Sequence, residues 1–265
     1  MLIILIKMKN KKISVITVTW NRVEFLEEAI ISVMNQKYEN FEHIIIDNAS
    51  SDGTVEMLKK YPHLIWLSEP DKGQSDAMNK GLKLATGDIF AWLNDDDLYP
   101  SGVFDLINKK LDLDAYSFAY GVCDIIGAKG KHIGRSNFHR FDRQRMMLGH
   151  NNVNTPAVFA SIDLIRQVGL MDESLFATFD LDMWIRLSLV KPPLPLREVT
   201  SLLRLHGSSG LMSNKVHLNE RRKIRLKYKH LVSFRYKFIF DIYLTLRHFF
   251  YDRIVMKKYS RDMNF

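Results

Sequence analysis

Short apolar runs alternate with helix-like stripes between residues 13 and 93. The runs are rich in β-branched residues, which predicts buried strands at 13–19, 42–46, 63–67 and 89–93. The stretches between them carry apolar side chains three or four positions apart, which predicts helices at 23–35, 54–60 and 73–84. Strands that alternate with helices are typical of a parallel sheet covered by helices on both faces. We therefore expect an α/β fold with a Rossmann-like, mostly parallel sheet.

The pattern changes after residue 110. A strand is expected at 116–126, and the Gly-Ala-Lys-Gly turn at 127–130 predicts a hairpin into 131–134. Further elements are expected at 155–160, 161–168, 179–190 and 198–205, with an irregular polar stretch at 136–154. No internal repeat or low-complexity linker divides the chain. We therefore expect one domain at 12–212, followed by a tail at 213–265.

The chain of 265 residues has a formal net charge of +8, which is placed unevenly. Residues 215–265 contain 14 Lys and Arg against 4 Asp and Glu, whereas the residues before them have a slight acidic excess. An acidic body argues against a nucleic-acid-binding protein, because such proteins carry a basic patch or stripe. Cys123 is the only cysteine, which excludes an intramolecular disulfide and fits a reducing compartment.

Aromatic and basic side chains are interleaved in the tail between residues 234 and 256. On an amphipathic helix this combination suits a membrane surface. The alternative is that the aromatic side chains cover the body or a dimer partner. No apolar stretch is long enough for a transmembrane helix. We favour a basic amphipathic helical tail that holds a cytoplasmic protein on the inner face of the cell membrane.

Three polar clusters follow directly after predicted strands, at 19–22, 47–50 and 95–97. The carboxyl ends of parallel strands meet at one edge of a sheet, and ligands bind in the crevice at that edge. The three clusters are therefore expected to form a single site.

The third cluster consists of Asp95, Asp96 and Asp97, directly after an apolar strand. Adjacent carboxylates resist burial unless something neutralises them. Mg²⁺ takes oxygen ligands and usually lies between one or two carboxylates and substrate phosphates. A metal–phosphate site is therefore one interpretation. A solvated acidic turn before a helix that begins near Pro100 is the other.

Five segments in order resemble the motifs of the family-2 glycosyltransferases, which have the GT-A fold. They are 15–22, 46–54, 68–81, 94–97 and 180–186. The third segment is similar to a subgroup that acts in bacterial surface-polysaccharide synthesis. The resemblance implies an inverting glycosyltransferase that moves a sugar from a UDP-, GDP- or dTDP-sugar to a hydroxyl of a saccharide or lipid-linked acceptor. It also implies a divalent metal cofactor, Mn²⁺ or Mg²⁺.

The resemblance implies roles for individual residues. Carried over position by position, the residues of the donor nucleotide pocket would be Thr19, Asn21, Asp47, Asn48 and Asp95. The metal ligands would be Asp96, Asp97 and His206. For His206, a hydrogen bond to the donor diphosphate and a plain surface position are alternatives. Asn94 stands where the Asp-x-Asp motif begins with an aspartate, and a neutral amide binds a cation less tightly than a carboxylate.

Asp180 is the predicted catalytic base, at the start of the last expected helix. Asp182 lies two positions further on and would face another side of that helix. Capping of the helix N-terminus is the alternative for both carboxylates. Contacts with the acceptor are expected from four residues, which are His150, Asn151, Asp182 and Trp184.

Two rival classes follow from the same residues. A nucleotide-sugar-binding module that has lost catalysis would account for Asn48 and Asn94, whereas Asp96 and Asp180 argue for an enzyme. A Rossmann dehydrogenase is disfavoured, because no Gly-x-Gly-x-x-Gly follows the first strand.

Overall fold

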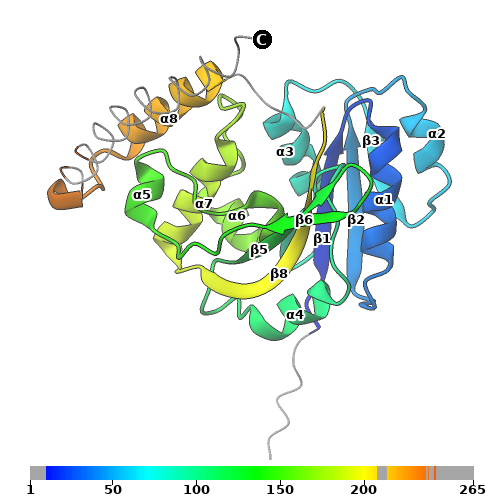
Figure 1. Ribbon diagram of the computed structural model, residues 1–265, viewed down its shortest axis with the longest axis horizontal. Helices are drawn as coiled ribbons and strands as arrows, with labels where there is room; N and C mark the ends of the chain where they lie inside the picture. Colours follow the sequence, from blue (N-terminus) through cyan, green and yellow to red (C-terminus); the bar gives the residue numbers. More distant parts are fainter. Residues whose placement is uncertain (1–9, 208–213, 237, 239–241, 243–265) are drawn as a thin grey trace, which may run out of the picture.

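The computed structural model describes residues 10–207, 214–236, 238 and 242. The strands are β1 (Ile13–Thr19), β2 (Phe41–Asp47), β3 (Leu64–Ser68), β4 (Ile89–Trp92), β5 (Phe118–Gly127), β6 (His132–Arg135), β7 (Val158–Ser161) and β8 (Leu194–Leu205). The helices are α1 (Val23–Met34), α2 (Thr54–Leu58), α3 (Gln74–Leu84), α4 (Val103–Lys110), α5 (Arg143–Met147), α6 (Ile162–Val168), α7 (Phe179–Val190) and α8 (Asn214–Tyr228). A 3-10 turn, η1 (Thr155–Ala157), precedes β7. Figure 1 shows the strands as a central sheet with helices on both sides.

The strands of the described chain form one mixed sheet in the order β3-β2-β1-β4-β7-β5-β6, with β8 paired to β5. The pairs among β1, β2, β3 and β4 are parallel, whereas β7 is antiparallel to both β4 and β5. In the parallel half, the carboxyl ends of β1, β2 and β4 therefore lie at one edge. This arrangement brings the three polar clusters of the sequence to the same side of the molecule.

The sheet is buried on both faces, as expected for β-branched strands in an α/β protein. On one face, Ile16 and Ile46 share a core with residues of α3, α6, α7 and α8. On the other face, Ile13 and Val15 pack against α1 and α4. Helix α3 lies so close to β1 that a Cβ added at Gly81 would be 2.5 Å from the Ile16 side chain. This contact holds the second half of α3 against the middle of β1.

The predicted α/β class with a mostly parallel sheet is confirmed. Elements differ in detail, because β8 already begins at Leu194 and the stretch 136–154 contains the short helix α5. Most of the aromatic tail between 234 and 256 lies outside the described residues. Among the helices of the described chain, none combines the length and the apolarity that crossing a membrane requires.

Candidate functional site

A pocket of about 780 Å³ opens at the carboxyl ends of β1, β2 and β4. One part of its wall comes from the segments that follow these strands and from the start of α3. These lining residues are Thr19, Trp20, Arg22, Asn48, Asp71, Gly73, Gln74, Asn94, Asp95 and Asp96. The other part comes from the second half of the chain. It includes Thr155, Phe176, Ala177, Phe179, Asp180 and His217.

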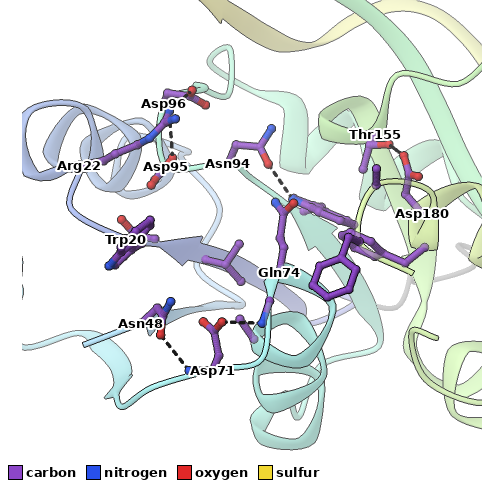
Figure 2. A pocket seen from close by; sticks show the side chains of 18 of the residues that line it. Trp20, Arg22, Asn48, Asp71, Gln74, Asn94, Asp95, Asp96, Thr155 and Asp180 are labelled. Atoms are coloured by element: carbon purple, nitrogen blue, oxygen red, sulfur yellow. Dashed lines mark hydrogen bonds and ion pairs between the residues drawn. The ribbon is translucent and has the colours of Figure 1, made fainter. Parts of the chain in front are cut away.

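Asp95 and Asp96 therefore line the same pocket as Asp180, although more than eighty positions separate them in the sequence. Figure 2 shows the two groups on opposite sides of the pocket, with Gln74 between them. The carboxylates of Asp95 and Asp96 thus face the carboxylate of Asp180 across a pocket whose volume is typical of small-molecule binding sites.

Asp96 is the most strongly paired member of the acidic cluster. Its Oδ2 accepts a hydrogen bond from Arg22 Nη1 at 2.7 Å and lies 3.0 Å from Nε2 of His206. The His206 ring packs on Phe25, with 4.4 Å between the ring centroids. His206 therefore contacts one of its predicted fellow metal ligands, although it is not itself part of the pocket wall.

Asp95 lies between Asp96 and the end of β1. It is only 8% exposed, and burial together with the neighbouring Asp96 carboxylate raises the pKa of Asp95 to about 6. The Arg22 guanidinium lies 3.9 Å away and offsets part of this rise. A bound cation would relieve the same repulsion, because an opposite charge favours the ionised form of a carboxyl group.

Asp97 does not line the pocket. Its side chain is fully buried and accepts hydrogen bonds from the backbone N–H of Arg204 at 2.8 Å and from Nδ2 of Asn94 at 2.7 Å. Burial and the Asp96 charge raise the pKa of Asp97 to about 7. The prediction that Asp97 binds the metal is corrected accordingly: its carboxylate joins the acidic loop to β8 instead.

Two of the residues predicted to bind the nucleotide have other contacts. Asp47 is buried beneath the pocket and accepts hydrogen bonds from the hydroxyls of Ser50 and Ser68. Asn21 bridges two loops, since its N–H donates to Ser50 and its Oδ1 accepts from the N–H of Ser51. Neither side chain lines the pocket, so both shape the wall rather than touch its contents.

Thr19 and Asn48 do line the pocket, as Asp95 does. The Oδ1 atom of Asn48 accepts a hydrogen bond from the N–H of Asp71 at 2.8 Å. Asp71 in turn accepts from the N–H of Gly73 at the start of α3. The side-chain amide of Asn48 therefore connects the end of β2 to the segment before α3. Figure 2 shows Asn48 and Asp71 on the lower wall of the pocket.

Asp180 lies in the first turn of α7. Its Oδ2 accepts hydrogen bonds from the Thr155 hydroxyl at 2.5 Å and from Nδ2 of Asn151 at 3.1 Å. Although part of the side chain faces the pocket, burial raises the pKa of Asp180 above the usual value of an aspartate. The Thr155 hydroxyl, the N–H of Leu181 and the nearby His217 offset part of this rise. A raised pKa makes a carboxylate a stronger base, which favours a role in accepting a proton.

The predicted acceptor contacts need correction at Asp182 and Trp184. Both side chains are fully buried and neither lines the pocket. Asp182 lies two positions after Asp180 and faces another side of α7, whereas Trp184 belongs to the hydrophobic core. Asp182 accepts hydrogen bonds from Arg186, Lys227 and Tyr228, and Trp184 packs on Phe118. His150 does not line the pocket, and Asn151 reaches it only through its bond to Asp180.

Several lining residues were not singled out from the sequence, and they include Asp71, Gln74, Thr155 and His217. Thr155 was assigned only to a strand, and His217 only to the tail. Asp71 and Gln74 lie within the third resembling segment, 68–81, which is a usable signal for both. No local pattern marks Thr155 or His217, because both reach the pocket through long-range packing.

The residues of the acidic loop fit a hard divalent cation. Asp95 and Asp96 offer carboxylate oxygens at the pocket wall, and Mg²⁺ usually takes one or two carboxylates together with substrate phosphates. Among the described residues, no group of three or more His, Cys, Asp or Glu side chains is arranged so that it could hold a metal ion without other ligands.

Comparison with known proteins identifies the family. The model of glycosyl transferase family 2 matches residues 14–165, and this chain belongs to that family. Among curated proteins, an uncharacterized glycosyltransferase of Rickettsia typhi is 29% identical over 205 residues, which cover 74% of this chain and 64% of the relative. The chain thus spans less than two thirds of that relative. A putative teichuronic acid biosynthesis glycosyltransferase of Bacillus subtilis is 34% identical over 106 residues, covering 38% of this chain and 40% of that protein.

Solved structures show the same fold. TarS of S. aureus, in complex with UDP-GlcNAc, has a TM-score of 0.65 at 19% identity, covering 80% of this chain and 65% of that chain. A mannosyltransferase from Pyrobaculum calidifontis, in complex with GDP-Man and Mn²⁺, has a TM-score of 0.58 at 14% identity, covering 89% of this chain and 80% of that chain. The fold is therefore GT-A, as the resemblance implied.

Proposed function

We propose that this chain is an inverting glycosyltransferase that transfers a sugar from a nucleotide-diphosphate sugar to an acceptor hydroxyl. The observation that carries the proposal is the shared pocket, in which Asp95 and Asp96 face Asp180. The first pair lies where a charged diphosphate would be held, and Asp180 lies where an attacking hydroxyl would lose its proton. The relatives in solved structures bind UDP-GlcNAc and GDP-Man, which supports this class of donor.

In this proposal the nucleotide lies against Thr19, Asn48 and Asp95, beside the exposed ring of Trp20. Asp47 and Asn21 hold the loops that form this wall. Asp96 and Asp95 would hold a divalent cation, with His206 beside Asp96. Such a cation neutralises negative charge that develops on the departing diphosphate.

Asp180 would act as the general base. It accepts the proton of the acceptor hydroxyl as that oxygen attacks the anomeric carbon from the side opposite the diphosphate. Thr155 and Asn151 orient the carboxylate through its Oδ2 atom. Fixing donor and acceptor in one pocket supplies a further part of the acceleration, because the reacting atoms are already close.

The name of the Bacillus subtilis relative supports a role in cell-surface polysaccharide biosynthesis. A location on the inner face of the membrane is part of the same proposal. On α8, Leu218 and Leu226 are 60% and 57% exposed, and the exposed Arg222 lies on the same side of the helix. Apolar and basic side chains on one face of a helix are attracted to an anionic bilayer.

The side chain of Asn94 has a contact that an aspartate could not make. It accepts a hydrogen bond from Trp92 Nε1 at 2.9 Å and donates to Asp97. An aspartate at this position has no N–H to donate to Asp97. Asn94 therefore has a structural role that is compatible with an active enzyme.

The test is a screen of UDP-, GDP- and dTDP-sugars with Mn²⁺ or Mg²⁺, with release of the nucleoside diphosphate as the readout. We expect one donor class to be turned over, slowly with water alone and faster with a saccharide acceptor. NMR of the product sugar should show an inverted anomeric configuration. Binding of a nucleotide sugar without any turnover would favour the binding module instead.

A further inference from the structure

Helix α8 lies beyond the residues that the family model matches, yet it packs directly against the pocket. Figure 1 shows it alongside α7 and α5. Its Ile224 and Tyr228 are buried in the same core cluster as Met183 and Trp184 of α7. At its amino-terminal end, His217 lines the pocket itself.

The approach between α8 and the body is unusually close at Gly149. This glycine has a φ of +85°, and an added Cβ would be 3.0 Å from the carbonyl oxygen of Arg221. A larger residue at this point would therefore push α8 away from the loop. The same loop continues to Asn151, whose amide donates to Asp180.

Glu220 makes the most informative contact of α8. Its side chain is 4% exposed, and its carboxylate accepts hydrogen bonds from the N–H of Phe176 at 2.7 Å and from the N–H of Ala177 at 2.8 Å. It also accepts from the hydroxyl of Thr178 at 3.2 Å. A buried carboxylate is tolerated here because three donors surround it.

The segment that Glu220 holds leads directly into the base. Phe176 and Ala177 line the pocket, Thr178 is the N-cap of α7, and Asp180 follows in the first helical turn. Thr178 does not cap the helix with its own side chain. The backbone path into α7 therefore depends on a side chain supplied by α8.

A second contact fixes α7 on the other side of Asp180. Asp182 accepts hydrogen bonds from Lys227 Nζ and from the Tyr228 hydroxyl, both at 2.7 Å. Two anchors from α8, one before and one after Asp180, thus limit both the position and the rotation of the first turn of α7.

We propose that Glu220 is a positioning residue for the transfer reaction: by binding the backbone at 176–178, it holds Asp180 at the distance from the donor at which it can act as a base. This inference rests on the proposed function in one respect, namely that Asp180 is the base. It predicts that loss of Glu220 reduces turnover and leaves the nucleotide side of the pocket unchanged.

The experiment compares Glu220→Gln and Glu220→Ala in the full chain with two controls. Asn219→Ala removes a polar side chain from the exposed part of the same helix. Ile107→Val weakens the buried core beside α4, on the other face of the sheet. The readouts are amide hydrogen exchange of peptides covering 174–182 and 89–100, the Kd for UDP and GDP with Mn²⁺, and kcat for nucleotide-sugar turnover.

For Glu220→Ala we expect faster exchange at 174–182 and unchanged exchange at 89–100. The value of kcat should fall by roughly 10- to 100-fold, because a small misplacement of a reacting group has effects of this size. The nucleotide Kd should not change. Glu220→Gln keeps one acceptor oxygen and should lie between Glu220→Ala and the wild type. Both controls should keep the wild-type kcat.

Unchanged exchange at 174–182, or an unchanged kcat, would overturn the inference. It would also fail if Ile107→Val lowered kcat as much as Glu220→Ala at an equal loss of Tm, since the effect would then reflect stability alone. If the wild type turned over no nucleotide sugar, the proposed function would be what fails. The exchange at 174–182 would still decide whether Glu220 positions this segment.

Discussion

Asp96 and Arg22 form an ion pair of 2.7 Å at the wall of the pocket. A side chain that the resemblance implies as a metal ligand is thus already paired with a cation of the chain itself. A metal ion that binds Asp96 must share this carboxylate with Arg22 or displace it.

Replacing Arg22 should therefore strengthen metal binding in the absence of nucleotide. For Arg22→Met we expect a Kd for Mn²⁺ that is lower by about fivefold, because a partly exposed ion pair contributes on the order of 1 kcal/mol. Titration of Mn²⁺ followed by electron paramagnetic resonance measures this change. Arg22→Lys keeps the charge and is the matched control. Equal affinities in all three proteins would show that the ion pair does not compete with the metal.

Removal of the metal or of its predicted ligand should weaken donor binding. We expect Asp96→Ala to lose the part of nucleotide-sugar binding that depends on Mn²⁺ or Mg²⁺, which calorimetry with and without a chelator can separate. Asp97→Asn is the comparison, because Asp97 does not line the pocket. Full activity in the presence of a chelator would contradict a metal-dependent mechanism.

Asp180→Asn should abolish proton transfer without disturbing the nucleotide side of the pocket. The asparagine side chain fits the same space but cannot act as a base. We expect kcat to fall by about 10²- to 10⁴-fold, the usual contribution of a general base, at an unchanged donor Kd. Stopped assays of nucleoside diphosphate release provide the rate. Substantial remaining turnover would assign the base to another residue.

The pH dependence of turnover should report the environment of Asp180. The base must be ionised, so activity falls as the pH drops through its pKa, which burial raises. The Thr155 hydroxyl stabilises the ionised form and lowers this pKa. Thr155→Val should therefore raise it and move the acid limb of the kcat/KM profile to higher pH. Thr155→Ser retains a hydroxyl and should keep the wild-type limb, whereas identical profiles for all three would exclude this role.

Contact with an anionic membrane should depend on the outer face of α8. Deleting the whole tail is not a suitable test, because Glu220 and Tyr228 of α8 hold the first turn of α7. Arg222→Glu combined with Lys229→Glu changes exposed charges only. We expect this variant to co-sediment less with phosphatidylglycerol vesicles than the wild type, and neither protein to bind phosphatidylcholine vesicles. If the variant and the wild type co-sediment equally with phosphatidylglycerol vesicles, an electrostatic contact through this face is ruled out.

Much of the fold was predictable from the sequence because its signals are local. The strand at 13–19 and the helix at 179–190 have the predicted bounds. In both, buried residues extend through nearly the whole element. The short helix α5 lacks such a signal, because five residues are too few for a helical stripe.

The site was predictable where a residue faces the pocket from the end of a strand. Thr19, Asn48, Asp95 and Asp96 belong to this group, and Asp180 lies at the start of a recognisable helix. Asp97 and Asp182 were misassigned because acidic side chains are usually solvated, whereas both are buried here among donors. Each carboxylate has a donor nearby in the sequence, but the others come from β8 and α8, over distances along the chain that no local pattern reports.

The pocket has two sides that come from separate stretches of polypeptide, one before residue 97 and one after residue 154. Substitutions can therefore accumulate on one side while the other keeps its shape. Under the proposed function, duplicated genes that diverged only in the later stretch would encode enzymes that draw on the same sugar supply and extend different glycans. Exchanging this stretch between relatives would then offer a route to new linkages without rebuilding the earlier side of the pocket.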